Sequence, residues 1–157
     1  MGHSSKLVNP SRSLDRTASP LSLQEIVGSV GRWCQARPVH LCVLFGSQTK
    51  GQAHSRSDVD LAIWPAHSLP PLTRLSWLRE LETALAQDVS LVWVSPELDP
   101  VLGFEIVRTG RLVFEMERGL WAERRAQLWH AFNDSLPFLR AARQHLHRFA
   151  QEVRRDL

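Results

Sequence analysis

Two aspartates separated by one residue, Asp58 and Asp60, open an apolar run of this chain and carry its clearest potential for chemistry. Side chains alternate faces in a strand, so both carboxylates would project from one face, about 6–7 Å apart. Val59, Leu61 and Ile63 would then fill the opposite face. Two such carboxylates repel, and Mg²⁺ suits them because it binds one or two carboxylates together with phosphate oxygens and water. The pair therefore predicts a magnesium site, in which two ions would assist a displacement at phosphorus.

A second motif, Gly46-Ser47, ends the preceding apolar run over residues 41–45. Gly46 would let the backbone approach a phosphate without an intervening Cβ, and Ser47 would offer a hydroxyl and an N–H group to it. Lys50 and Arg56 follow in the same connection and would neutralise phosphate charge. The alternative is an ordinary Gly-Ser turn with solvated loop charges. The two motifs together, between two apolar runs, favour the phosphate-binding interpretation.

Gly46-Ser47, ten further residues and then Asp58-x-Asp60 form a combination that resembles the minimal nucleotidyltransferase (MNT) family of the DNA polymerase β superfamily. Ser57 extends the match, and the resemblance covers residues 41–115. It implies an α/β fold of the polymerase β type, with a short mixed sheet, helices on one side and a C-terminal helical tail. It also implies that ATP is the substrate, that Mg²⁺ is the cofactor and that Ser57 joins the nucleotide-binding residues.

The resemblance further implies a partner protein. Stand-alone MNT domains are often antitoxins that silence HEPN-type toxins by adenylylating a tyrosine. This chain contains no tyrosine, so a tyrosyl acceptor would have to belong to the partner. The leading hypothesis is therefore transfer of a nucleoside monophosphate from ATP to a hydroxyl of a HEPN-type toxin, with release of pyrophosphate.

The chain departs from the family pattern at the third strand, where a third carboxylate is usual and Ser90 stands instead. A serine neither carries that charge nor acts as a base near neutral pH. Asp88 lies two residues earlier, on the same side of the strand, and would complete the catalytic set if the register shifts. Alternatively, Asp88 simply ends the preceding helix. Ser90 therefore predicts weakened or absent catalysis.

Two other functions compete with the leading hypothesis. Ser90 favours a catalytically degenerate module that neutralises its partner by contact alone. A small-molecule nucleotidyltransferase of the aminoglycoside-modifying kind would need an acidic pocket for its polycationic substrate, and the net charge of +3 argues against it. The charge is too mild for us to expect direct nucleic-acid binding.

The elements around the motifs define three regions. Residues 1–20 are expected to be disordered, residues 21–118 to form the nucleotidyltransferase domain, and residues 119–157 to form a helical segment that packs on the domain or a partner. Capping signals predict helices that begin after Ser22 and Asp99. We expect helices over 23–36, 71–87 and 100–110, and strands over the two apolar runs, 88–94 and 111–116. The expected buried stripe of the second helix is Leu75, Leu78, Leu81 and Leu85.

The C-terminal segment should be interrupted near Pro137, where proline starts a new helix or kinks one. Its first apolar stripe, which includes Trp129 and Phe132, is expected to pack on the sheet. The second stripe, from Leu139 to Leu157, is compatible with core packing, a partner interface or a homo-oligomer.

The composition of the 157 residues fits one cytoplasmic domain. No apolar segment approaches the roughly 20 residues that span a bilayer, so we expect no membrane association. Cys34 and Cys42 lack a metal-binding spacing and are expected to be reduced core thiols.

Overall fold

A computed structural model describes residues 19–50 and 58–155. Most of the expected disordered segment, and Arg56 and Ser57, lie outside the described residues. The elements in chain order are α1 (Leu23–Gln35), β1 (Val39–Phe45), the short 3₁₀ helix η1 (Gly46–Lys50), β2 (Val59–Pro65), α2 (Pro71–Leu85), β3 (Val89–Trp93), α3 (Pro100–Thr109), β4 (Arg111–Glu115) and α4 (Leu120–Arg155).

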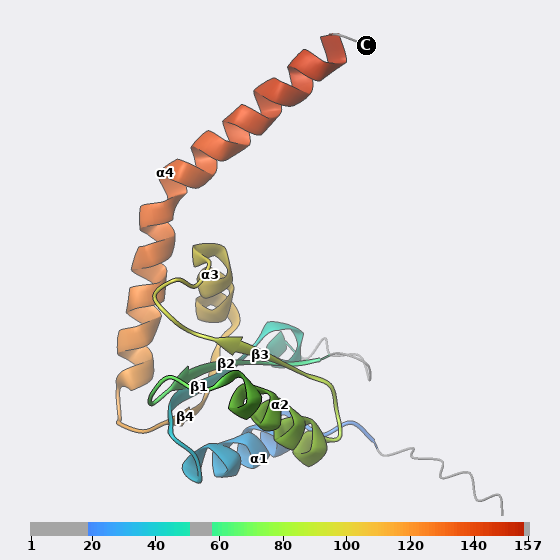
Figure 1. Cartoon of the computed structure of the whole chain (residues 1–157), viewed down its shortest axis with the longest axis vertical. Helices are drawn as coiled ribbons and strands as arrows, with labels where there is room; N and C mark the ends of the chain where they lie inside the picture. Colours follow the sequence, from blue (N-terminus) through green and yellow to red (C-terminus); the bar gives the residue numbers. More distant parts are fainter. Residues whose placement is uncertain (1–18, 51–57, 156–157) are drawn as a thin grey trace, which may run out of the picture.

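The four strands form one mixed sheet, as the sequence predicted, and their order in the sheet is β3-β2-β1-β4 (Figure 1). Strand β1 is antiparallel to both β2 and β4, whereas β2 and β3 are parallel. The register places Asp60 opposite Phe45 on one side and opposite Ser90 on the other. The end of β1, the start of β2 and the start of β3 therefore meet at one end of the sheet.

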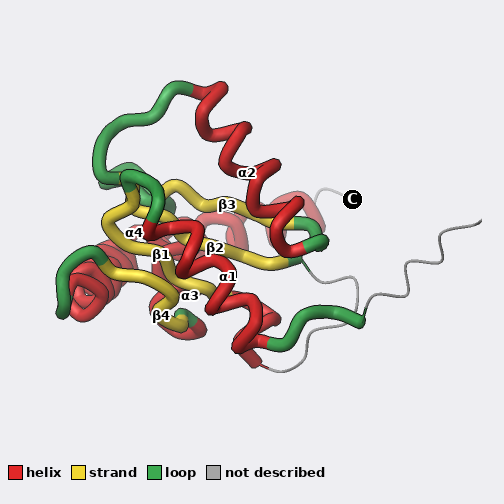
Figure 2. The backbone as a smooth tube through the Cα atoms, turned by 90° about the horizontal axis from the view of Figure 1, so that it is seen from below, coloured by secondary structure: helices red, strands yellow, loops and turns green. Residues whose placement is uncertain are grey.

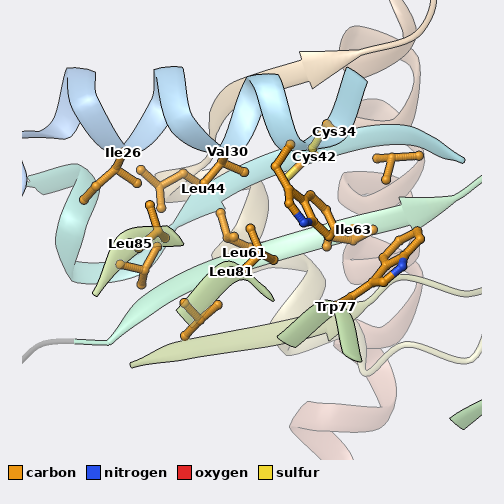
Figure 3. Packing of buried hydrophobic residues seen from close by; sticks show 14 of the residues in the cluster. Ile26, Val30, Cys34, Cys42, Leu44, Leu61, Ile63, Trp77, Leu81 and Leu85 are labelled. Atoms are coloured by element: carbon orange, nitrogen blue, oxygen red, sulfur yellow. The ribbon is translucent and has the colours of Figure 1, made fainter. Parts of the chain in front are cut away.

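Helices α1 and α2 cover one face of the sheet (Figure 2). Their apolar side chains interlock with every second residue of β1 and β2, and Figure 3 shows this packing around Leu61 and Ile63. The fully buried members include Ile26, Val30, Cys34, Cys42, Leu44, Leu61, Ile63, Leu81 and Leu85. This core holds β2 in place, with Val59 and Leu61 inward, and so sets the direction of Asp60.

The expected placement of helices on one side of the sheet was wrong, because α3 and the first part of α4 cover the second face. Leu41, Val43 and Phe45 of β1 point toward this layer and are buried against Ile106. The physical reason lies in β1 itself: its run is apolar on both faces, so both faces must be buried.

The predicted helix starts are confirmed. Ser22 and Glu25 form a reciprocal capping box at α1, and the Asp99 side chain accepts a hydrogen bond from the Val101 N–H at α3. The predicted stripe of α2 was partly wrong: Leu81 and Leu85 are buried with Trp77, whereas Leu75 is 49% exposed. Trp77 takes the place of Leu75 in the core because its ring packs between Trp33 and Trp93, with ring centroids 5.1 and 5.8 Å away.

Helix α4 is continuous and contains Pro137, so proline does not start a new helix. Figure 1 shows the axis of α4 changing direction along its length, as the alternative of a kink predicted. Phe132 packs on α3 and not on the sheet as predicted: its ring stacks on Phe104 with ring centroids 4.2 Å apart. Trp129 was also expected to pack on the sheet, but its side chain is 47% exposed.

Both cysteines are free and buried, as predicted. A hydrogen bond with Cys34, together with burial, raises the pKa of the Cys42 thiol well above its usual value. Within the ranges that the structure describes, no helix has the length and apolar character needed to cross a membrane.

Candidate active site

Gly46 lies at the junction between β1 and η1, with a left-handed φ of +79°. A Cβ atom built at this position would lie 2.5 Å from Oδ2 of Asp60. Glycine is therefore required for two reasons: the backbone conformation is strained for other residues, and the Asp60 carboxylate occupies the space of a side chain. The turn and the Asp60 carboxylate therefore lie side by side, which brings the two predicted motifs together.

Both backbone polar groups of Gly46 are held by threonines. Its N–H donates to Oγ1 of Thr109 at 2.9 Å, and its carbonyl accepts from Oγ1 of Thr49 at 2.7 Å. Thr109 in turn donates to the Glu105 carbonyl at 2.9 Å. Helix α3, which packs on the second face of the sheet, therefore fixes the backbone at Gly46 through its last residue, Thr109.

Asp58 and Asp60 flank the first residue of β2. Asp58 is exposed, whereas Asp60 is half-buried. Burial, and next the negative charge of Asp58, raise the pKa of the Asp60 carboxyl, and a hydrogen bond with the Ser90 side chain lowers it. The repulsion from Asp58 that the sequence predicted is thus the second cause of this raised pKa, after burial, and a nearby positive charge would lower the pKa again.

Ser90, on β3, is the neighbour of Asp60 across the parallel pair. Position 90 therefore faces the carboxylate pair, where a third carboxylate would be expected from the resemblance. Asp88 is exposed and directly precedes β3, an outer strand of the sheet. Its backbone carbonyl accepts a hydrogen bond from the Val59 N–H at 2.9 Å. Among the described residues, no three acidic, histidine or cysteine side chains are grouped so that they could hold a metal ion. Asp88 thus forms no such group with Asp58 and Asp60.

The remaining predicted site residues are placed only in part. Ser47 follows Gly46 in η1 and is exposed, and Lys50 ends η1. Thr109 is a residue that the sequence analysis missed, because its bond to Gly46 joins positions 63 residues apart. The only local signal for it is a threonine in the last turn of a helix.

Cavity volume does not locate the site. A cavity of about 480 Å³ lies at the other end of β2, between Trp64, Val94 and Leu128. None of the predicted site residues within the described ranges lines it. The candidate site is defined instead by the turn with positive φ at Gly46 and by the paired carboxylates.

Comparison with known proteins places these residues in a family. The family model described as "Polymerase beta, Nucleotidyltransferase" matches residues 32–119, more than half of the chain. The protein adenylyltransferase MntA of Shewanella oneidensis is 39% identical to this chain over 54 residues, which are 34% of this chain and 39% of that relative. The match therefore spans only about two fifths of the length of the curated relative.

Solved structures show the same fold. A chain from a toxin–antitoxin crystal structure with AMP-PNP matches with a TM-score of 0.63 and 23% identity, over 80% of this chain and 98% of that one. A chain from the complex of tri-AMPylated Shewanella oneidensis HEPN toxin with MNT antitoxin matches with a TM-score of 0.59 and 21% identity, over 82% and 98%. The segment matched by the family model contains Gly46, Asp58, Asp60, Ser90 and Thr109. The chain belongs to the polymerase beta nucleotidyltransferase family.

Proposed function

We propose that this protein is a Mg²⁺-dependent nucleotidyltransferase that binds ATP at Gly46, Ser47, Asp58 and Asp60. The observation that carries the proposal is the contact between the turn and the carboxylate, where a Cβ at Gly46 would lie 2.5 Å from Asp60 Oδ2. This arrangement places the turn, where Ser47 would offer its N–H group and hydroxyl to a phosphate, beside carboxylates suited to a cation. A nucleoside triphosphate with bound magnesium requires both groups in one place.

The donor set fits magnesium. Asp58 and Asp60 supply hard oxygen ligands, and a bound cation would offset the burial and the charge of Asp58 that raise the pKa of the Asp60 carboxyl. Asp58 and Asp60 would hold the metal, and two ions would supply charge neutralisation at the reacting phosphate. Lys50, Arg56 and Ser57 remain predicted contacts to the triphosphate.

The residues of this chain divide the work of the reaction. The turn at Gly46 would bind and orient the triphosphate, with Ser47 adding a hydroxyl donor from an exposed position. An acceptor hydroxyl would then attack the α-phosphorus, and pyrophosphate would leave. The described residues offer that hydroxyl no carboxylate base at position 90, and Asp88 is the nearest candidate along the strand.

The proposed acceptor belongs to a HEPN-type toxin. The curated relative is named an adenylyltransferase, and a structural neighbour is an MNT antitoxin in complex with an AMPylated HEPN toxin. These names support transfer of AMP to a partner protein, and the absence of tyrosine from this chain is consistent with an acceptor on the partner. The proposed site of action is the cytoplasm, where ATP and Mg²⁺ are available.

The first test is calorimetric titration of ATP with and without Mg²⁺. Asp58→Asn and Asp60→Asn should each abolish the Mg²⁺-dependent part of the affinity, because each removes a charge without changing the side-chain volume. Asp134→Asn, an exposed aspartate on α4, is the matched control and should bind as wild type does. Unchanged Mg²⁺-dependent affinity in both site variants would contradict the proposal.

A contact-only antitoxin is the second candidate, and Ser90 favours it. A missing general base typically costs about 10²–10⁴-fold in rate, so such a protein would bind its partner and transfer little. Because position 90 faces Asp60, Ser90→Asp should accelerate transfer of labelled AMP to a co-purified toxin. Rapid transfer by the native protein that Asp88→Asn eliminates would instead identify Asp88 as the base. Partner binding without transfer by either the native protein or Ser90→Asp would favour the contact-only function.

A further inference from the structure

The distal part of α4, residues 138–155, extends away from the sheet and the other helices (Figure 1). Every residue in this part is exposed, and no residue anywhere in α4 is buried. An isolated helix of this length is only marginally stable in water. An exposed helix that carries large apolar side chains is therefore best explained by a contact surface.

The apolar side chains of this part gather on one side of the helix. At about 100° per residue, they fall within an arc of about 120°. We call this arc the distal stripe, and it consists of Phe138, Leu139, Ala142, Leu146, Phe149 and Val153. Phe138, Leu146 and Phe149 are 78%, 66% and 59% exposed.

The distal stripe continues a surface that already packs on a helix. In the first part of α4, Phe132 stacks on Phe104 of α3, with ring centroids 4.2 Å apart. Leu139, Leu146 and Val153 follow Phe132 at intervals of seven residues. A seven-residue repeat is the spacing by which one helix packs along another. The side of α4 that carries Phe132 thus packs on helix α3 near the sheet. Farther along α4, the same side contacts no helix among the residues that the structure describes.

Charge indicates the character of the missing helix. Residues 138–155 contain five arginines and one glutamate. Arg140, Arg143 and Arg154 follow one edge of the distal stripe, as the same helical spacing shows. If two copies of this helix packed antiparallel, the arginine edge of one copy would lie against the arginine edge of the other, and the like charges would repel. The charge therefore disfavours a second copy and favours an acidic partner.

We propose that the distal stripe is a docking surface for an acidic amphipathic helix of a partner protein. The helix would bury its apolar face against Leu146 and Phe149 and place carboxylates along the arginine edge. This inference does not depend on nucleotidyl transfer, because the distal stripe lies outside the candidate active site. A basic amphipathic helix can also bind an anionic membrane, but the seven-residue spacing from Phe132 onward favours a helix as the occupant.

The test uses the full chain and a labelled helical peptide of 21 residues, with leucine at the a and d positions and glutamate at e and g. Fluorescence anisotropy should show binding by the native protein. The double variant Leu146→Asp/Phe149→Asp should weaken it at least tenfold. Gln144→Asp/Gln151→Asp adds the same charge on the opposite side of the helix and should bind as the native protein does. All variants should keep native affinity for ATP with Mg²⁺, so a failed docking surface is distinguishable from a failed nucleotide site.

A charge exchange gives a second, independent measurement. Arg140→Glu/Arg143→Glu should bind the glutamate peptide more weakly and prefer a peptide with lysine in place of glutamate. Circular dichroism of each variant should show native helical content. No binding of the glutamate peptide, equal binding of both peptides, or equal binding by the Leu146→Asp/Phe149→Asp variant would each overturn the proposal. It would also be overturned if the native protein instead bound phosphatidylglycerol vesicles, or sedimented as a dimer, through the same side chains.

Discussion

At Gly46, the backbone and the side chain of Asp60 occupy adjoining space, and a single added carbon would bring them into collision. Gly119 offers a comparison within the same chain. It also has a positive φ, +94°, but a Cβ there would meet nothing within 4 Å. The two glycines therefore share the conformational requirement and differ in the contact, which allows the two effects to be separated.

Gly46→Ala should lose most affinity for ATP with Mg²⁺, because the added methyl group displaces the Asp60 carboxylate. Gly119→Ala should lose about 1–2 kcal/mol of stability from backbone strain while keeping that affinity. Ser47→Ala removes one hydroxyl hydrogen bond, worth about 0.5–1.5 kcal/mol, and should weaken binding by about twofold to tenfold. Calorimetry and thermal unfolding of the three variants measure both effects. Native affinity in Gly46→Ala would reduce the turn to a simple connector.

The raised pKa of Asp60 predicts how stability depends on pH in the absence of metal. A carboxyl whose pKa is higher in the folded than in the unfolded state binds more protons when folded, so stability falls as pH rises through that window. The window begins near the ordinary aspartate pKa of about 3.9 and extends upward. Asp60→Asn should therefore raise the melting temperature at pH 7 by up to a few degrees, with no gain below about pH 4.

Mg²⁺ should reduce the difference in melting temperature between Asp60→Asn and the wild-type protein at pH 7, because a bound cation offsets the repulsion between Asp58 and Asp60. Thermal unfolding scans from pH 3.5 to 8, with and without Mg²⁺, measure it. Asp134→Asn, at an exposed position on α4, serves as the matched control for the change from aspartate to asparagine. A wild-type protein more stable than Asp60→Asn throughout this range would show that burial and Asp58 do not destabilise the ionised carboxyl.

At the scale of elements, α3 supports the candidate active site from the opposite side of the turn. Its last residue, Thr109, both accepts from the Gly46 N–H and donates to the Glu105 carbonyl, so one hydroxyl connects the helix end to η1. The position of α3 thus sets the position of the turn. A hydroxyl is required for this role, whereas the methyl group of threonine is not.

Thr109→Val keeps the shape of the side chain but leaves the part-buried Gly46 N–H without its acceptor, at a cost of about 1–3 kcal/mol. We expect a lower melting temperature and weaker ATP binding in this variant. Thr109→Ser retains the hydroxyl and should restore both properties toward native values. Equal behaviour of the valine and serine variants would mean that packing, not the hydrogen bond, holds the turn.

The sequence predicted those features of the elements that have local causes. Ser22 with Glu25, and Asp99 with the following proline, mark helix starts by bonds within one turn. The direction of the Asp60 side chain, opposite to that of Val59 and Leu61, followed from the alternation of side chains along a strand. Burial of Trp77 in place of Leu75 could not be predicted locally, because α2 carries leucines on several sides and contacts with Trp33 and Trp93 decide which side faces inward. The role of Thr109 was equally inaccessible, since it arises only when α3 packs over the sheet.

At the scale of the whole molecule, the family segment and the distal stripe are separate parts. The family model ends at residue 119, one residue before α4 begins. The first part of α4 packs on α3, but beyond residue 137 every described residue is exposed. Nucleotide chemistry and partner docking would thus be located on different parts of one chain, with α4 as the connection between them.

This separation predicts the effect of removing residues 138–157. The deletion removes no buried side chain among the described residues, so the remaining chain should unfold within a few degrees of the native melting temperature. It should also keep native affinity for ATP with Mg²⁺, because Gly46, Asp60 and Thr109 lie in the family segment, outside the deleted residues. Binding of the acidic helical peptide should be lost entirely. Thermal unfolding, calorimetry and anisotropy on the same preparation distinguish these outcomes. A large fall in melting temperature would instead show that the distal part of α4 contributes to the folded domain, which its complete exposure argues against.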